Sequence, residues 1–525
     1  MARLYEYQSK SLLKSGGLRI PQGRVVSSPE DVRAAAGEIG RPVVLKIQVW
    51  STGRAGIGGI QFAQTPEEAF KKTQDLLGME VQNLVVEKLL VEERLDISEE
   101  YFAGWVIDDE KKTPLLIFSK SGGTGIEDIA RRSPGSLVRI PVDARMGIKE
   151  YQIRNTLRKL NLSGRKLIRL SAALAQFAAV ARKYDARSAE MNPMVMTGNG
   201  HVYAADCHFT VDDYAVYRHP ELGIEVAREF DRPATELEKI AYRVEEKDHR
   251  GTFYFFQMRD RIQPEDNAIG FNGAGGGGSM MSMDAVLNQG FSLANFCDTS
   301  GNPSAAKVYR AAKIILSQPG IKGYFASGSG VASQEQYHSA RGLVKAFLED
   351  HLDIPAVIRL GGNYEVKAIE ILHDHLDTIP GRVEGYGRDD SPEFCATRMK
   401  ELVDDSGGRI HEVKLMEEPD IPSQAYVFRT LTGEVRIDHR LCPECSSQGC
   451  VEACVPGILK LEKGLPVLAV EPDAAAKGKC TECLACEIFC RFHERRAVFI
   501  HLPVPGLMEY RKKSAEKTES QGRGS

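Results

Sequence analysis

Residues 41–59 read RPVVLKIQVWSTGRAGIGG, a short apolar run followed by a glycine-rich loop. The run is rich in β-branched residues, which predicts a strand. Lys46 lies inside this run, where a buried ammonium is costly unless it meets an anion. The alternative is a lysine that reaches solvent from an edge strand. Because the N–H groups of a glycine loop can hold phosphate or carboxylate oxygens, the stretch predicts an anion-binding strand and loop.

The composition of the whole chain narrows the classes of partner. The chain has 525 residues, too many for one core, and a net charge of −4. This charge gives no reason to expect nucleic acid or an acidic membrane surface as a partner. No apolar run approaches the length of a membrane-spanning helix, and the first residues lack the pattern of a signal peptide. We therefore expect a cytoplasmic protein, in which dense cysteines indicate metal binding rather than disulfides.

The pattern of helix and strand signals divides the chain. Ser28-Pro29 and Thr65-Pro66 are typical helix starts in an N-terminal region of mixed elements. From about residue 266, three apolar runs each end in glycines before a helical segment, which predicts an open parallel sheet. The predicted parts are a mixed domain at 1–225, a connector at 226–265, a parallel-sheet domain at 266–376, a linker at 377–430, a cysteine domain at 431–505 and a disordered tail at 506–525.

Three oxygen-bearing side chains flank a predicted hairpin in the N-terminal domain. Glu190 and Asn192 precede MVMTGNGHVYAAD, and Asp206 is the last residue of that stretch. Oxygen ligands of this type suit Mg²⁺, which binds through one or two side chains and keeps other positions for water and phosphate. The alternative is that these are ordinary surface residues.

Six motifs occur in a fixed order over about residues 1–375. They are LYEYQSKSLL, the strand with Lys46, STGRAGIGG, SKSGGTGIED, AEMNPMVMTGNGHVYAAD and NGAG before a helix. In this order they resemble the β subunit of succinyl-CoA synthetase, an ATP-grasp, NDP-forming acyl-CoA ligase. The resemblance implies an α/β multidomain protein with an ATP-grasp domain followed by a flavodoxin-like, parallel-sheet ligase domain.

The resemblance also implies roles for individual residues. The nucleotide would be ATP bound with Mg²⁺. The implied assignments are Lys46, Gly53 and Arg54 at the nucleotide phosphates, Glu92 at the nucleotide hinge, Asn192 and Asp206 at Mg²⁺ with Glu190 beside them, Glu100 near an incoming phosphohistidine, and Asn272 at the carboxylic acid.

The expected mechanism requires a second chain. In the family a histidine is phosphorylated by ATP, the phosphoryl group moves to the carboxylate, and CoA displaces phosphate. None of the twelve histidines lies in a Gly-His-Ala-Gly run. We therefore expect an α-like partner subunit that carries the phosphohistidine, with CoA at the interface.

The sequence departs from the family at three places. The loop GRAGIGG lacks the usual lysine, and Cys207-His208 stands where the family has Gly-Lys. The stretch SGSGVASQEQ at 327–336 lacks an arginine that the family places near the acid. The residues for phosphate and magnesium are therefore retained, whereas those near the acid differ.

Eight of the eleven cysteines lie in two quartets near the end of the chain. The spacing Cys480-x₂-Cys483-x₂-Cys486-x₃-Cys490 is that of bacterial ferredoxins. The domain resembles a small α+β ferredoxin with two 4Fe–4S clusters, and the alternative is two zinc sites. In a ferredoxin the last cysteine of each quartet ligates the other cluster. The implied ligand sets are Cys442, Cys445 and Cys450 with Cys490, and Cys480, Cys483 and Cys486 with Cys454.

Together these features predict the β-like subunit of an ATP-dependent acid–CoA ligase fused to a ferredoxin domain. The ferredoxin domain would link it to a redox partner protein that acts on the acid or its thioester. The alternative is an iron–sulfur electron-transfer protein in which the ATP-grasp and ligase folds gate a redox complex.

Overall fold

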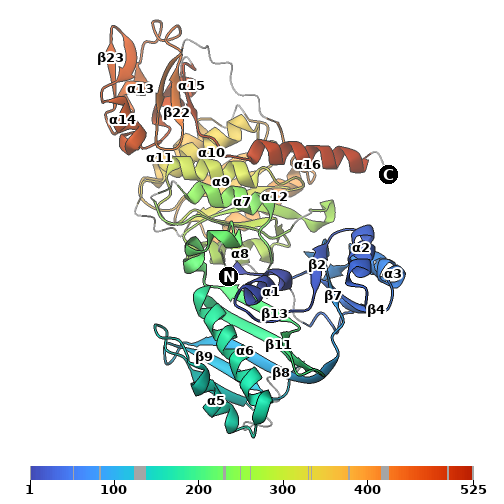
Figure 1. The fold of residues 1–525 in the computed structure, drawn as a ribbon. Helices are drawn as coiled ribbons and strands as arrows, with labels where there is room; N and C mark the ends of the chain where they lie inside the picture. Colours follow the sequence, from blue (N-terminus) through green and yellow to red (C-terminus); the bar gives the residue numbers. More distant parts are fainter. Residues whose placement is uncertain are drawn as a thin grey trace. The chain divides into compact units, whose positions relative to one another are not determined.

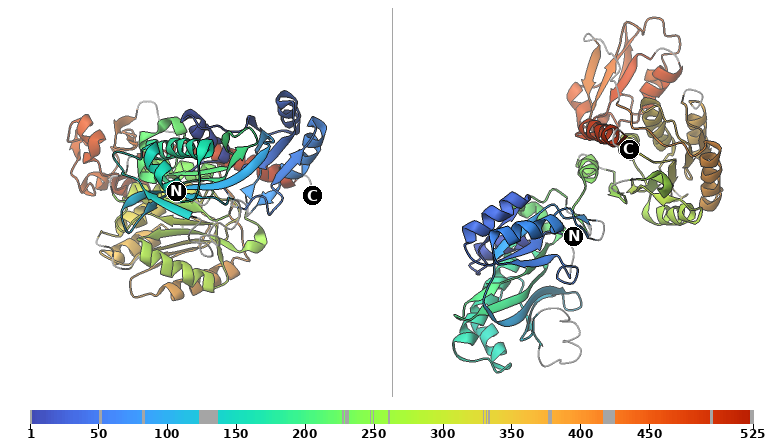
Figure 2. Two further views of the ribbon diagram at one scale, coloured as in Figure 1. Left: turned by 60° about the horizontal axis from the view of Figure 1, so that its bottom comes forward. Right: turned by 90° about the vertical axis from the view of Figure 1, so that its right-hand side faces the viewer.

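The computed structural model describes residues 2–522 except 51–52, 82–83, 123–136, 227, 229–231, 247, 249, 260–261, 329, 331, 333, 376–378, 416–424 and 494–495. The chain forms two compact units, Met1–Ala234 and Thr235–Ser525, and each is described by itself (Figures 1 and 2). We call them the N-terminal unit and the C-terminal unit. The described helices include none that is long and apolar enough to cross a bilayer.

The larger sheet of the N-terminal unit is antiparallel, in the order β1-β13-β11-β8-β9-β10, with β12 beside β11. Helix α6 lies along one face of this sheet and buries Leu170, Leu174 and Phe177, which are spaced for one side of a helix (Figure 1). The bounds are β1 Ala2–Arg3, β8 Ile97–Asp108, β9 Thr113–Ser119, β10 Leu137–Pro141, β11 Ala186–Thr197, β12 Val202–Ala204, β13 Cys207–Val211, α1 Glu6–Ser15, α5 Glu150–Arg158 and α6 Gly164–Lys183.

The smaller sheet of this unit has the order β2-β7-β3-β4 and is also antiparallel. Ser28 and Thr65 cap helices α2 and α3 through their side chains, with a proline in the first turn, which confirms the predicted helix starts. Strand β3 lies between β7 and β4, so Lys46 sits on an interior strand. The bounds are β2 Gly23–Val26, α2 Pro29–Ile39, β3 Val43–Ile47, β4 Ile60–Ala63, α3 Pro66–Leu76, β5 Glu80–Val81, β6 Leu84–Val85 and β7 Leu89–Glu93.

The C-terminal unit is built on a sheet of order β14-β17-β15-β18-β19-β20, parallel except for β14, which confirms the predicted parallel sheet. Tyr324 and Ile358 pack with α9, α10 and α11, whereas Phe325 and Val357 pack with α8 and α12. Helices therefore cover both faces. The bounds are α7 Glu236–Glu245, β14 Tyr254–Gln257, β15 Ala268–Ala274, α8 Gly276–Asn288, β16 Ser292–Leu293, β17 Asn295–Asp298, α9 Ala305–Ile315, β18 Tyr324–Gly328, α10 Tyr337–Glu349, β19 Ala356–Arg359, α11 Glu365–His373, β20 Val383–Tyr386 and α12 Pro392–Asp405.

Two segments expected to connect domains belong to this sheet instead. The predicted connector at 226–265 contains α7 and β14, and β14 pairs with β17. The predicted linker at 377–430 contains β20, which pairs with β19, and α12, which buries its apolar side against α8 and the sheet. The strands β14 and β20 are short, so only long-range pairing identifies them. Helix α12, in contrast, begins with a Ser391-Pro392 cap that the sequence itself indicates.

The cysteine domain consists of a three-stranded sheet of order β21-β22-β25, the hairpin β23-β24 and short helices. Its apolar side chains form one continuous core with those of α9, α10 and α11. The expectation that a linker separates two independent cores is therefore wrong. The bounds are β21 Tyr426–Arg429, β22 Glu434–Ile437, α13 Gly449–Glu452, β23 Leu459–Glu462, β24 Leu465–Leu468, α14 Pro472–Ala474, α15 Ala485–His493 and β25 Val498–His501.

The tail at 506–525 was predicted to be disordered, but most of it forms a helix, α16 Leu507–Gly522. Its Arg511 is 1% exposed and pairs with Asp350 at 2.8 Å, while its Nε donates to the Ser317 hydroxyl at 2.7 Å. The charged composition of this segment predicts disorder. The segment is ordered because Arg511 binds the buried carboxylate of Asp350, which lies far away in the sequence.

Candidate functional site

A cluster of six charged side chains, five of them buried, joins α1, β3, β7, the loop after β3 and the segment between β12 and β13 in the N-terminal unit. Three are cations and three are carboxylates, so the cluster balances its own charge. Its members are Lys10, Lys46, Arg54, Glu6, Glu92 and Asp206.

Lys46 lies at the centre of this cluster and is 8% exposed. Its Nζ lies 2.8 Å from a carboxylate oxygen of Glu6 and 3.1 Å from one of Glu92, and it donates to the Ala205 carbonyl at 2.6 Å. Burial alone would lower the pKa of Lys46, but the carboxylates of Glu6, Glu92 and Asp206 raise it above its ordinary value. The lysine is therefore a fixed cation and does not snorkel to solvent.

Arg54 connects the glycine loop to the predicted magnesium ligand. Its Nη2 donates to both carboxylate oxygens of Asp206, at 2.8 and 2.9 Å, and its Nη1 lies 2.8 Å from Glu6. Gly53 precedes it with φ of +71°, a left-handed conformation that glycine adopts without strain. The loop therefore turns sharply and aims the guanidinium inward.

Glu6 is the carboxylate that the cations share. Burial would raise the pKa of Glu6, but Lys10, Lys46 and Arg54 hold it well below its usual range. Glu92 bonds Lys10 through both oxygens, at 2.7 and 2.6 Å, so it anchors the cluster in this structure. Its predicted role at the nucleotide hinge stays a prediction.

The three predicted magnesium ligands lie beside one another. The Asn192 N–H donates to the Asp206 carbonyl at 3.2 Å, and Glu190 lies opposite His208 in the β11–β13 register. Burial and the nearby Asp206 raise the pKa of Glu190, although His208 opposes them. Two neighbouring carboxylates and an amide side chain are ligands of the type that a hard cation such as Mg²⁺ accepts.

Glu6 and Lys10 are members of the cluster that sequence reasoning missed. They lie four residues apart on α1, and the two side chains pair at 2.7 Å. Their spacing in LYEYQSKSLL places both on the same side of the helix as Leu13, which is fully buried. A pair of opposite charges on the apolar side of a helix was the available signal.

The residues expected near the phosphohistidine and the acid are not members of this cluster. Glu100 is exposed on β8 in the N-terminal unit. Asn272, on β15 of the C-terminal unit, is 5% exposed and donates to the Tyr324 hydroxyl at 2.8 Å. After β15, the Gly275 N–H at the start of α8 donates to Asp298 at 2.9 Å, so a carboxylate already caps this loop.

The stretch at 327–336, which lacks the expected arginine, is contacted by an arginine of the neighbouring strand. Arg359, on β19, is 8% exposed, and its Nη1 donates to the Gly328 carbonyl at 3.0 Å. Its other N–H groups donate to the carbonyls of Asp390 and Arg388. The guanidinium therefore supports the backbone here, and the positions 329, 331 and 333 of this stretch lie outside the described residues.

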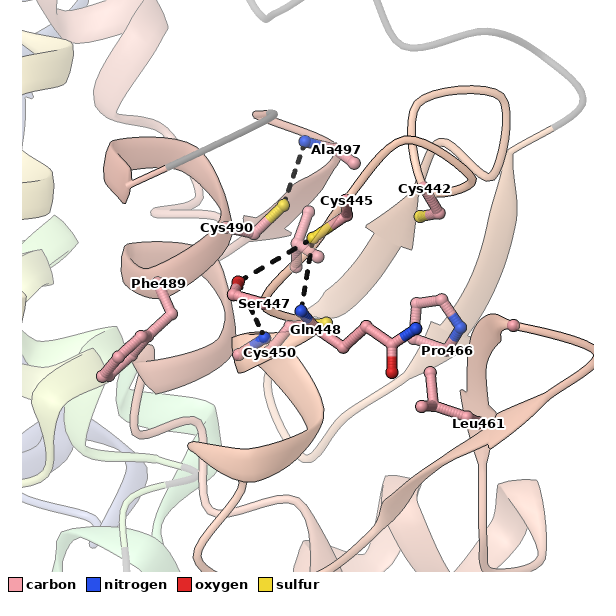
Figure 3. Close-up of a pocket in the computed structure, with 13 residues that line it drawn as sticks. Cys442, Cys445, Ser447, Gln448, Cys450, Leu461, Pro466, Phe489, Cys490 and Ala497 are labelled. Atoms are coloured by element: carbon pink, nitrogen blue, oxygen red, sulfur yellow. Dashed lines mark hydrogen bonds between the residues drawn. The ribbon is translucent and has the colours of Figure 1, made fainter.

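In the cysteine domain, three cysteines of the earlier quartet and one of the later quartet line one open pocket (Figure 3). The Gln448 N–H donates to the Cys445 sulfur at 3.4 Å, and the Ala497 N–H donates to the Cys490 sulfur at 3.1 Å. Burial and neighbouring sulfurs raise the pKa of Cys442 to about 12. The four are Cys442, Cys445, Cys450 and Cys490.

The remaining four cysteines are electrostatic neighbours of one another. Burial raises the pKa of Cys480 to about 12, and the nearby sulfurs of Cys483 and Cys454 add to this effect. Burial also raises the pKa of Cys486, and the sulfurs of Cys483, Cys480 and Cys454 add to this effect. The structure thus sorts the cysteines into two sets of four, each with three members from one quartet and the last member of the other.

Within the described residues, no three His, Cys, Asp or Glu side chains converge closely enough to hold a single metal ion. A cubane cluster makes a different demand, because each thiolate binds a separate iron and the four sulfurs surround a volume. The four cysteines of Figure 3 line one pocket together.

Comparison with known proteins identifies the family. Residues 3–196 match the ATP-grasp domain family. The chain is 35% identical over 369 residues to the GDP-forming succinate–CoA ligase subunit beta of Thermus thermophilus, which covers 70% of this chain and 93% of the relative. It is 34% identical over 409 residues to the ADP-forming subunit beta of Rubrobacter xylanophilus, covering 77% and 99%.

A solved structure shares the fold. ATP citrate lyase from Methanothrix soehngenii, in complex with citrate and coenzyme A, superposes with a TM-score of 0.60 at 19% identity and covers 76% of this chain and 99% of that chain. The two sequence relatives are matched over more than nine-tenths of their length and exceed 30% identity. The chain therefore belongs to the family of succinate–CoA ligase β subunits, which are acid–thiol ligases of the ATP-grasp type.

Proposed function

We propose that this chain is the β-like subunit of an ATP-dependent, NDP-forming acid–CoA ligase, and that its cysteine domain holds two 4Fe–4S clusters for electron transfer. Membership of the ligase family supports the first part. The observation that carries it is the buried cluster around Lys46, where cations of the nucleotide site and a predicted magnesium ligand meet.

The cluster suits Mg·ATP because its charges can exchange partners. Lys46 and Arg54 are the cations for the nucleotide phosphates, and they are now matched by Glu6, Glu92 and Asp206. Asp206 would turn from Arg54 to Mg²⁺, assisted by Asn192 and Glu190. The guanidinium that Asp206 releases would then be available to phosphate oxygens. Bound magnesium supplies charge neutralisation for phosphoryl transfer.

The rest of the reaction requires a partner subunit. We infer that an α-like chain brings the phosphohistidine and binds CoA, since no histidine here lies in the expected motif. Glu100 is exposed on β8 and is accessible to an incoming segment. The substrate is a carboxylic acid, and Asn272 is assigned to its recognition.

The test of the nucleotide site is the substitution Asp206→Ala, measured by calorimetry of ATP binding with and without Mg²⁺. We expect at least tenfold weaker binding in the presence of Mg²⁺. Binding without the metal should not weaken, because Arg54 loses its competing carboxylate. Asp109→Ala, which removes an exposed carboxylate in a hairpin turn of the same unit, is the control. An unchanged magnesium dependence in Asp206→Ala would contradict the assignment.

The two sets of cysteines support the proposed clusters. A two-cluster ferredoxin exchanges the last cysteine of each quartet, and the pocket containing Cys490 together with Cys442, Cys445 and Cys450 agrees with this exchange. The N–H groups that donate to sulfur in Figure 3 are of the kind that stabilises cluster thiolates.

Anaerobic purification with metal analysis tests this part. We expect about eight iron and eight sulfide per chain. Cys490→Ala should damage the cluster near Cys442, and Cys454→Ala should damage the one held by the later quartet, as resolved by EPR. Two zinc atoms without iron would refute the clusters, whereas loss of the cluster from the mutated quartet would refute only the exchange.

A second function is favoured by one observation, the continuous core between the cysteine domain and the parallel-sheet domain. Such a junction would suit a redox protein in which the nucleotide and ligase folds gate electron transfer. The two functions are separated by an assay with the partner subunit. Acyl-CoA formation supports the ligase, and electron transfer that depends on ATP without acyl-CoA formation supports the alternative.

A further inference from the structure

One buried cation of the C-terminal unit pairs with no carboxylate among the residues that the structure describes. Arg341 lies on α10 and is 8% exposed. Within the described residues, its Nε and Nη1 are buried and have no hydrogen-bond partner. Buried guanidinium donors are normally satisfied, so this exception calls for an acceptor.

The surroundings of Arg341 indicate which acceptor that is. Its guanidinium stacks over the Tyr337 ring, 4.6 Å from the ring centre. Burial lowers the pKa of Arg341, and the groups that oppose this effect are Cys483, Tyr337 and Cys486. Helix α10 contacts α15, which carries Cys486, and Lys345, one turn from Arg341, pairs with Glu487 of α15. The guanidinium therefore lies on the side of α10 that faces the later cysteine quartet.

A neighbouring cation on the same helix shows the contrast. Lys345 lies one turn further along α10 and is 1% exposed. Its Nζ pairs with Glu487 of α15 at 2.7 Å and with Glu349 at 2.8 Å. Both cations of α10 thus face the cysteine domain, and Lys345 is matched by carboxylates. Among the described residues Arg341 has no hydrogen-bond partner at Nε or Nη1, and the cysteine sulfurs on this side carry negative charge when they ligate metal.

We propose that Arg341 is the counter-charge of the cluster held by Cys454, Cys480, Cys483 and Cys486, and that it raises the reduction potential of this cluster. The inference rests on the proposed function, because it requires that cluster. Reduction adds one negative charge to an assembly of thiolates and sulfides. A buried cation beside these sulfurs stabilises the reduced form more than the oxidised form.

This assignment gives the ligase fold a part in the redox chemistry. Helix α10 follows β18 of the parallel sheet, so a cation from the ligase domain sets a property of the cysteine domain. The contact between α10 and α15 holds the two together. The cluster near Cys442 lacks such a contribution from Arg341 and serves as an internal reference.

The test is an EPR-monitored titration with dithionite and mediators on the full chain, purified anaerobically. Arg341→Gln removes the charge and keeps a polar side chain. We expect at least a tenfold fall in the reduced-to-oxidised ratio at a fixed potential, a 59 mV lower midpoint for a one-electron couple. The midpoint of the cluster near Cys442 should stay unchanged.

Two further variants make the result specific. Lys477→Gln removes a cation three residues before Cys480 whose side chain is 75% exposed, so water already screens its charge. We expect little change in its midpoints. Arg341→Lys keeps the charge and should give a midpoint between those of the wild type and Arg341→Gln; it also provides a measurement if Arg341→Gln does not fold.

The possible outcomes separate the inference from the proposed function. Both clusters present with the same midpoints in the wild type and Arg341→Gln overturn the role of Arg341 alone. An equal shift in Lys477→Gln overturns it as well, because the effect would then not depend on burial. A wild-type chain without iron overturns both proposals.

Discussion

The ion pair between Lys345 and Glu487 links the parallel-sheet domain to the cysteine domain, and its removal has a calculable effect. Both side chains are 1% exposed, and the nitrogen and oxygen lie 2.7 Å apart. Glu487→Gln preserves the shape but leaves the lysine buried with one carboxylate fewer. Breaking a buried pair from one side costs about 3–5 kcal/mol.

We expect the lower end of this range, about 3 kcal/mol, because Lys345 keeps Glu349 at 2.8 Å. For a unit of this size, about 2 °C of melting temperature is lost per kcal/mol, which gives a fall of roughly 6 °C. Differential scanning calorimetry of the full chain should show this fall in the transition of the C-terminal unit, with the N-terminal transition unchanged.

A matched control makes the same chemical change at the surface. Glu370→Gln breaks a pair with Lys367 at 3.1 Å on α11, where both side chains are more than half exposed. Such a pair contributes at most about 1 kcal/mol, so the melting temperature should change by no more than about 2 °C. A Glu487→Gln variant that melts no lower than Glu370→Gln would refute the reasoning that the two domains share one buried, charged junction.

Two further predictions concern the same unit. Burial, together with Arg341 and Arg250, lowers the pKa of His338 from its ordinary 6.5 to about 4. Between these two pH values the unfolded chain binds a proton that the folded chain does not. The free energy of unfolding should therefore fall as the pH drops from about 6.5 to about 4. His338→Gln should reduce this slope in urea unfolding, and an unchanged slope would count against it. Removing all residues after 415 should leave ATP binding in the N-terminal unit and destabilise the rest, because Asp350 loses Arg511; a truncated chain whose C-terminal unit melts at the wild-type temperature would contradict the shared core.

Local features of the sequence determined much of the architecture. The Ser28-Pro29 and Thr65-Pro66 helix starts, and the three strands that end in glycine, were correct because capping and strand propensity act over a few residues. The cysteine spacing likewise predicted that Cys490 belongs with the earlier quartet, and Cys490 lines one pocket with Cys442, Cys445 and Cys450. Membership of the ligase family followed from ordered motifs.

Only the tertiary structure decided which charges meet. Glu6 and Arg54 lie in different elements, and nothing local in the sequence shows that one carboxylate is shared by three cations. Arg511 lies in a segment whose composition suggested disorder, yet it is buried against Asp350. Nothing local in the sequence shows that Arg341 is buried, because the segments that cover it lie elsewhere in the chain. Burial and pairing are long-range properties, and an ionised side chain is stable inside a protein only when distant parts of the chain bring it a partner.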